Sequence, residues 1–217
     1  MRKCLIIWLI ANTVLFSCGQ KSKSTPGTNT SKITGNVESQ KSVTIPDDKY
    51  IDTRYEYAES TDKHLIIENS LPKGGQKYTA PNGKEYVYAI FWTRITNKTA
   101  SPFELTLDFP ADSLKLPSSP DNYVKILLPS DKMTLDKAPL FNYGLTGLDS
   151  LLDDGHHSSS ILQRTINPND SSTFYIVTLF NQGVEGVVRA GFKLKEQNLF
   201  YRINDKQIHC GRIIFQN

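Results

Sequence analysis

The chain lacks several features that would mark a familiar class of protein. It has 217 residues, of which only three are cysteine and four are histidine. Its longest mostly apolar run, residues 4–16, has about 13 residues, whereas a transmembrane helix needs about 20, so we predict no permanent membrane-spanning helix. The formal net charge is only +3 and the basic residues do not cluster, which argues against nucleic-acid binding.

The short motifs of common enzymes are also absent. The sequence contains no G-x-S-x-G, which presents a nucleophilic serine, and no H-E-x-x-H, which binds zinc on a helix. The glycines at 74 and 75 lack the spacing of a phosphate-binding loop. No pair of acidic residues is marked out for glycoside hydrolysis. The sequence therefore favours a non-enzymatic role.

The first 17 residues have the pattern of a secretory signal. Arg2 and Lys3 precede the apolar run, which closes on Leu15-Phe16-Ser17-Cys18. This closing segment resembles the lipobox of bacterial lipoproteins, in which a leucine at −3 and a small residue at −1 precede a cysteine. The resemblance implies that residues 1–17 are removed and that Cys18 carries a diacylglyceryl group, with acyl chains such as palmitate.

The residue after the cysteine bears on which membrane holds the protein. In proteobacterial lipoproteins an aspartate at that position marks retention at the inner membrane, and here Gly19 stands in its place. The resemblance therefore implies the outer membrane and leaves open whether the domain faces the periplasm or the cell surface. Two or three acyl chains would anchor the protein stably, where one would not.

The residues after the leader divide into a tether and one domain. Residues 19–43 are mostly serine, threonine, lysine, glycine and asparagine, so they bury too little surface to offset the entropy lost on ordering. We predict a flexible tether over 18–46 and a folded domain over 47–217. Cys210 would be the only thiol left in that domain, and a lone cysteine in an apolar strand is typically a small buried side chain.

The domain has the pattern of a mainly β fold. Residues 85–96 are apolar on both alternating faces, which indicates a strand buried on both sides, and residues 103–109 alternate as a half-buried strand. Further strands are predicted at 50–57, 64–68, 123–128, 160–166, 173–180, 187–194, 199–203 and 207–215. Asn82-Gly83 predicts a turn, and three prolines in 110–120 predict an irregular loop. This spacing predicts a single Ig-like antiparallel β-sandwich.

One short helix is predicted between the strands. Four leucines in residues 145–152 share one helical face, and Gly155 suits the position after the helix end, so we expect a short crossover helix. Asp153, His156 and His157 beside it are the densest set of candidate metal ligands. Adjacent histidines rarely reach one ion, so a solvated helix end is the main alternative. A metal-dependent hydrolase around Asp153 and His157 is the least favoured function, and no cofactor is expected.

Aromatic side chains provide the other candidate site. Tyr86, Tyr88 and Trp92 share one face of their strand, and Trp92 is the only tryptophan after the leader. On an open face these rings could stack on sugars, which would make the domain a carbohydrate-binding module. Packing in the core is the alternative, and a buried Trp92 would exclude the sugar-binding site.

Two further segments, residues 86–95 and Arg164-Thr165-Ile166-Asn167-Pro168, resemble parts of uncharacterised bacterial lipoproteins. That resemblance implies no activity. The sequence predicts a lipid-anchored protein of the cell envelope whose domain is a non-enzymatic binding or structural module. Its expected partners are the membrane, through the N-terminal lipid, and an envelope protein or a glycan, with no nucleic acid.

Overall fold

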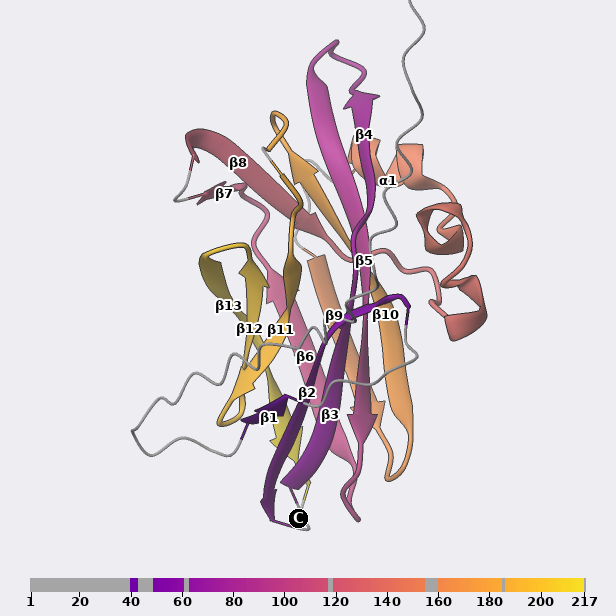
Figure 1. Cartoon of the computed structure of the whole chain (residues 1–217), viewed down its shortest axis with the longest axis vertical. Coiled ribbons are helices and arrows are strands. Elements are labelled where there is room, and N and C mark those ends of the chain that lie inside the picture. Colours follow the sequence, from indigo (N-terminus) through magenta and orange to yellow (C-terminus); the bar gives the residue numbers. More distant parts are fainter. Residues whose placement is uncertain are drawn as a thin grey trace, which may run out of the picture. The chain divides into compact units, whose positions relative to one another are not determined.

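Antiparallel strands in two sheets form the fold. The computed structural model describes residues 40–42, 49–60, 63–116, 119–154, 160–184 and 186–216. The predicted leader, Cys18, His156 and His157 lie outside these residues. The described strands belong to one unit that runs from Asn36 to Asn217, and Figure 1 shows their arrangement.

The larger sheet has eight strands, and its central strands are β5 and β10. Its order is β1 (Gln40–Ser42), β2 (Ile51–Ser60), β3 (Lys63–Ser70), β5 (Glu85–Asn97), β10 (Ser171–Phe180), β8 (Ser119–Leu127) and β7 (Leu114–Leu116), and β4 (Lys73–Thr79) pairs with β5. Because β8 pairs with β10 only over Val177–Phe180, the first half of β10 has a strand neighbour on one side only.

The smaller sheet has five strands, and the first and last strands in its order are edge strands. Its order is β11 (Ala190–Lys195), β12 (Asn198–Ile203), β13 (Lys206–Phe215), β6 (Phe103–Phe109) and β9 (Ser160–Ile166). Three helical turns connect β8 to β9 and thus connect the two sheets: η1 (Leu135–Lys137), η2 (Phe141–Gly144) and α1 (Leu148–Asp154).

Apolar side chains from both sheets pack against one another in the main core. Aromatic rings dominate its centre: Phe192 lies 4.8 Å from Tyr201 and 5.8 Å from Phe174, between ring centroids. Phe109 packs edge-on against Tyr201 at 5.6 Å. Rings at these separations bury large areas and add a favourable edge-to-face contact. The predicted β-sandwich is confirmed.

A second core lies on the outer face of the eight-stranded sheet. Residues 128–154, which we call the cover segment, bring Met133, Tyr143 and Leu152 against Trp92 of β5 and Tyr175 of β10. Figure 1 shows the helical part of the cover segment beside β4, β5 and β10. Burial between two cores explains why β5 is apolar on both faces, as its sequence predicts.

Hydrogen bonds fix the cover segment to the sheet. The hydroxyl of Tyr175 donates to the carbonyl of Tyr143 at 2.7 Å, and the hydroxyl of Tyr143 donates to the carbonyl of Leu71 at 2.7 Å. The Lys73 ammonium donates to the carbonyls of Ala138 and Leu140, both at 2.6 Å. Burial raises the pKa of Tyr175 to about 12, so its hydroxyl stays a donor in the folded protein at neutral pH.

One asparagine links the two sheets across their interface. Asn69 of β3 is 1% exposed, and its amide oxygen accepts from the backbone N–H of Phe192 in β11 at 2.8 Å, while its Nδ2 donates to the carbonyl of Phe192 at 3.1 Å. The hydroxyl of Thr93 also donates to Asn69 Oδ1 at 2.9 Å. The Asn69 side chain therefore provides the hydrogen bonds that a neighbouring strand would provide to the backbone of β11.

Two sequence predictions about elements are wrong in detail, and one strand was not predicted. Residues 40–42 of the predicted tether form β1, because their backbone pairs with Tyr55–Tyr57 of β2. No strand was predicted at residues 73–79, but the chain turns within two residues of β3 into β4, which has a bulge beside Gly74. The predicted irregular loop around residues 110–120 contains β7 and the start of β8, and these two strands pair with each other.

Candidate functional site

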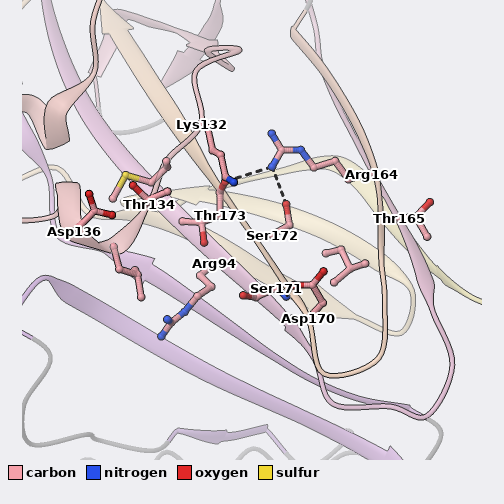
Figure 2. A pocket seen from close by; sticks show the side chains of 13 residues that line it. Arg94, Lys132, Thr134, Asp136, Arg164, Thr165, Asp170, Ser171, Ser172 and Thr173 are labelled. Carbon is pink, nitrogen blue, oxygen red and sulfur yellow. Dashed lines mark hydrogen bonds between the residues drawn. The ribbon is translucent and has the colours of Figure 1, made fainter.

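A pocket of about 480 Å³ opens at the side of the sandwich, and we call it the edge pocket. Four parts of the chain surround it: the end of β9, the turn into β10, the first residues of β10 and the start of the cover segment, with Arg94 of β5 beneath (Figure 2). Its lining consists of Arg94, Lys132, Met133, Thr134, Leu135, Asp136, Arg164, Thr165, Ile166, Asp170, Ser171, Ser172 and Thr173.

Arg164 is a cation that lines this pocket and has unused hydrogen-bonding capacity. Its Nη1 donates to Ser172 Oγ at 3.0 Å and to the carbonyl of Thr173 at 3.3 Å, so the side chain bridges from β9 to β10. The residue is half-buried, and no carboxylate among the described residues forms an ion pair with it. A guanidinium has five N–H donors, so a further acceptor can bind it.

Arg94 plays a different part, because its guanidinium already binds a carboxylate. Its Nε lies 2.5 Å from Glu68 Oε2, and Arg54 Nη1 lies 3.1 Å from Glu68 Oε1. Register places the three residues in one row across β2, β3 and β5, with Glu68 only 2% exposed. The buried carboxylate is thus paired on both sides, and Figure 2 shows the Arg94 guanidinium turned away from Arg164.

The edge pocket borders backbone that has no strand neighbour. β9 pairs with β6 on one side, and no described strand pairs with its other side. The first half of β10 is met on its open side only by an isolated bridge between Lys132 and Phe174. Every second residue of an edge strand turns its N–H and C=O outward, so β9 offers donors and acceptors to an approaching chain.

The pocket offers groups that can bind a ligand. It contains hydroxyl groups and charges of both signs. Cys210, the one free thiol of the described residues, is buried in the main core, and burial raises the pKa of its thiol well above the usual range. In the pocket Arg164 can bind a carboxylate, and beside it the unpaired edge of β9 can pair with a further strand.

Trp92 and its neighbours do not form the open aromatic face that the sugar-binding prediction requires. Trp92 is 1% exposed and packs edge-on against Tyr143 at 6.4 Å between ring centroids. Tyr88 is 6% exposed and donates its hydroxyl to Gln76 Oε1 at 2.6 Å, while Tyr86 is half-buried. A sugar site on Trp92 is therefore wrong, because the cover segment occupies that face, and the alternative of core packing is confirmed.

The predicted metal ligands are described only in part. Asp153 lies at the end of α1 and accepts a hydrogen bond from the hydroxyl of Tyr78 in β4, so it helps to hold the helix on the sheet. His156 and His157 lie outside the described residues. Within the described part of the chain, no three histidine, cysteine, aspartate or glutamate residues are grouped closely enough to hold a metal ion.

A second cavity of about 470 Å³ lies at the end of the sandwich. Val87 and Ala89 of β5 and Phe180 of β10 line it together with Val187 and Val188 of the β10–β11 connection. Its lining is mainly apolar, and the two lysines beside it have their ammonium groups engaged: that of Lys73 with carbonyls and that of Lys77 with Glu85.

No family model, curated protein or solved structure matches this chain in the comparisons with known proteins. In the part of the chain that the structure describes, no helix has both the length and the apolar character to cross a membrane. The edge pocket was not predicted from the sequence. Its one signal there is Arg164, an arginine on the inward-facing side of a strand whose neighbours Leu162 and Ile166 are apolar.

Proposed function

We propose that this protein is a lipid-anchored binding protein of the cell envelope, and that the edge pocket is where it binds a protein partner. The observation that carries the proposal is the coincidence of the pocket, the unpaired side of β9 and the half-buried Arg164. A pocket beside free backbone groups favours a polypeptide ligand over a glycan, because a polypeptide can satisfy those groups along the whole strand.

The anchor in this proposal rests on the leader and on Leu15-Phe16-Ser17-Cys18. The lipobox resemblance supports removal of residues 1–17 and acylation of Cys18, which would hold the domain at the outer membrane. Two or three acyl chains, each CH₂ group contributing about 0.8 kcal/mol when buried in lipid, make such an anchor stable.

Replacing Cys18 with alanine is expected to abolish incorporation of a clickable palmitate analogue and to move the protein from the membrane fraction to the soluble fraction. Cys210→Ala is the matched control. Because that thiol is buried in the core, its replacement should leave labelling unchanged. Labelling that survives Cys18→Ala would contradict the lipid anchor.

Binding at the edge pocket is tested by a photo-crosslinking amino acid placed at Thr165 in the lipidated full chain in intact cells. Thr165 lies among the residues that line the pocket, and its exposed side chain is on the outward side of β9, beside any chain that binds along that edge. Gln207 is an exposed control in β13, away from the pocket. We expect a discrete protein adduct from position 165 and none from position 207. Recovery of uncrosslinked monomer from both positions, or an adduct that only glycosidases remove, would argue against a protein partner.

A further inference from the structure

The two edge strands of the five-stranded sheet differ in whether their outward-facing backbone groups have hydrogen-bond partners. At β11, outward-facing backbone N–H groups are already satisfied by side chains of the other sheet: Phe192 N–H donates to Asn69 at 2.8 Å and Leu194 N–H donates to the Tyr57 hydroxyl at 2.9 Å. At β9, the one acceptor on the described backbone that a side chain reaches is the carbonyl of Ile166, bound by Asn97 Nδ2 at 2.9 Å. One edge is therefore closed and the other is open.

The first half of β10 is met on its open side by the bridge from Lys132, and the remaining strand edges in the described part of the chain are short, charged or bulged. β1 and β7 have three residues each, β2 carries Asp52 and Arg54 beyond its pairing with β1, and β4 has a bulge beside Gly74. Proteins use such devices to keep sheet edges from pairing with other chains. β9 has seven residues with no proline, lysine or bulge, and its Ile161 is 64% exposed.

We propose that an extended segment of a partner protein adds to β9 as a further antiparallel or parallel strand, and that Arg164 binds an acidic side chain of that segment. The proposal rests on the proposed function and names the class of ligand. Strand addition supplies affinity through the main chain, and pockets beneath alternate side chains supply specificity.

The alternating directions of the side chains along β9 determine where on the added strand the acidic residue would lie. Leu162, Arg164 and Ile166 lie on the inward side of the strand, and Gln163 and Thr165 lie on the outward side. A residue that pairs with Arg164 from the open side also points inward, into the edge pocket. There its carboxylate would meet the guanidinium donors that Ser172 and Thr173 leave unused.

The surrounding charges limit the ligand to one carboxylate. Arg164, Lys132, Arg94 and Arg54 are the cations at and behind the pocket, and Glu68, Asp136 and Asp170 are the anions, which leaves a single excess positive charge. One acidic side chain neutralises that excess, whereas a polyanion would meet the exposed carboxylates of Asp136 and Asp170. Charge complementarity therefore selects a mostly neutral segment with one acidic residue.

The probe is a displayed library of random nine-residue peptides, panned against the lipidated full chain held in detergent micelles. We expect enriched sequences to place aspartate or glutamate at one fixed position among β-branched residues. Arg164→Gln should remove the acidic preference, and Arg212→Gln, at an exposed arginine of the same sheet, should leave it intact. Enrichment without an acidic position, no enrichment, or a preference that survives Arg164→Gln would overturn the proposal.

Backbone pairing is tested on the best enriched peptide by N-methylation of alternate residues. Only every second N–H of an added strand points toward β9, so one set of methylations should weaken binding by about tenfold or more and the other set should not. Equal effects of both sets would overturn strand addition. Thermal unfolding of Arg164→Gln, compared with wild type, confirms that the variant is folded.

The two proposals can fail separately. A protein adduct from the crosslinker at Thr165, together with a library that shows no acidic position, would leave the proposed function standing and overturn the strand-addition model. Absence of the adduct together with absence of enrichment would overturn both.

Discussion

Replacing Asn69 with alanine is expected to lower the free energy of unfolding by about 3 kcal/mol, one of the two largest losses that we predict for a single substitution in this domain. The N–H and C=O of Phe192 and the hydroxyl of Thr93 would lose their partner in a buried site. Each buried polar group left without a partner costs about 1 to 3 kcal/mol. Urea unfolding followed by circular dichroism measures the change.

Asn198→Ala is the matched control for this substitution. Asn198 is an exposed asparagine in β12, and its Oδ1 contacts His209 at 3.3 Å on the surface. An exposed contact of this kind contributes little, so we expect a change of about 0.5 kcal/mol or less. Equal losses in the two variants would show that Asn69 does not join the sheets in solution.

Gly191 gives an independent check of the same contact. A Cβ atom on Gly191 would lie 2.5 Å from Asn69 Cγ and 2.8 Å from Asn69 Cβ, closer than atoms in contact can approach. Gly191→Ala should therefore destabilise the domain strongly in the wild-type background and less in the Asn69→Ala background, where Cγ is absent. Strictly additive changes in the double-mutant cycle would mean that the two residues do not touch.

Replacing Trp92 with alanine is expected to cost about 3 to 5 kcal/mol, the range found when a large buried aromatic side chain is removed from a core. Trp92 of β5 is 1% exposed and packs against the cover segment, so its loss leaves a cavity against Tyr143. Trp92→Phe should cost less than half as much, because it keeps most of the ring contacts and removes an indole N–H that has no acceptor among the described residues.

Phe141→Ala is the control for the tryptophan series. Phe141 lies in the same cover segment but is 73% exposed, so its removal should change the free energy of unfolding by about 0.5 kcal/mol or less. Unfolding in urea, followed by far-ultraviolet circular dichroism for all variants, allows direct comparison. A Trp92→Ala variant as stable as wild type would contradict burial of the ring and reopen the surface role that the sequence suggested.

Most strands could be predicted from the sequence because their signals are local. Residues 103–109 alternate between apolar and polar side chains and form β6 with those bounds, and residues 160–166 form β9 with those bounds. The cover segment could not be predicted in the same way. Its residues Asn142 and Tyr143 adopt positive φ angles of 48° and 55°. Asparagine adopts this backbone conformation more readily than most residues, but tyrosine rarely does, so the sequence does not indicate it at Tyr143.

The edge pocket escaped prediction for a geometric reason. Its walls come from β5, β9, β10 and the cover segment, and only the pairing of strands from both sheets places Arg94, Lys132 and Arg164 around one space. Sequence alternation shows that Arg164 faces inward, but it does not show that the strand is an edge. In contrast, the candidates that are conspicuous in the sequence, Trp92 and Tyr88, are buried because conspicuous aromatic residues usually fill cores.

The pairing of β5 with β10 has a consequence for how the chain is made. These central strands join residues that lie roughly 80 positions apart, and a loop of that size must close before the two strands can pair with each other. The amino-terminal half thus cannot complete its sheet while the rest of the chain is still being synthesised. Pairing at such separations also slows folding, because the entropy lost on closing the loop must be offset before the non-local contacts form.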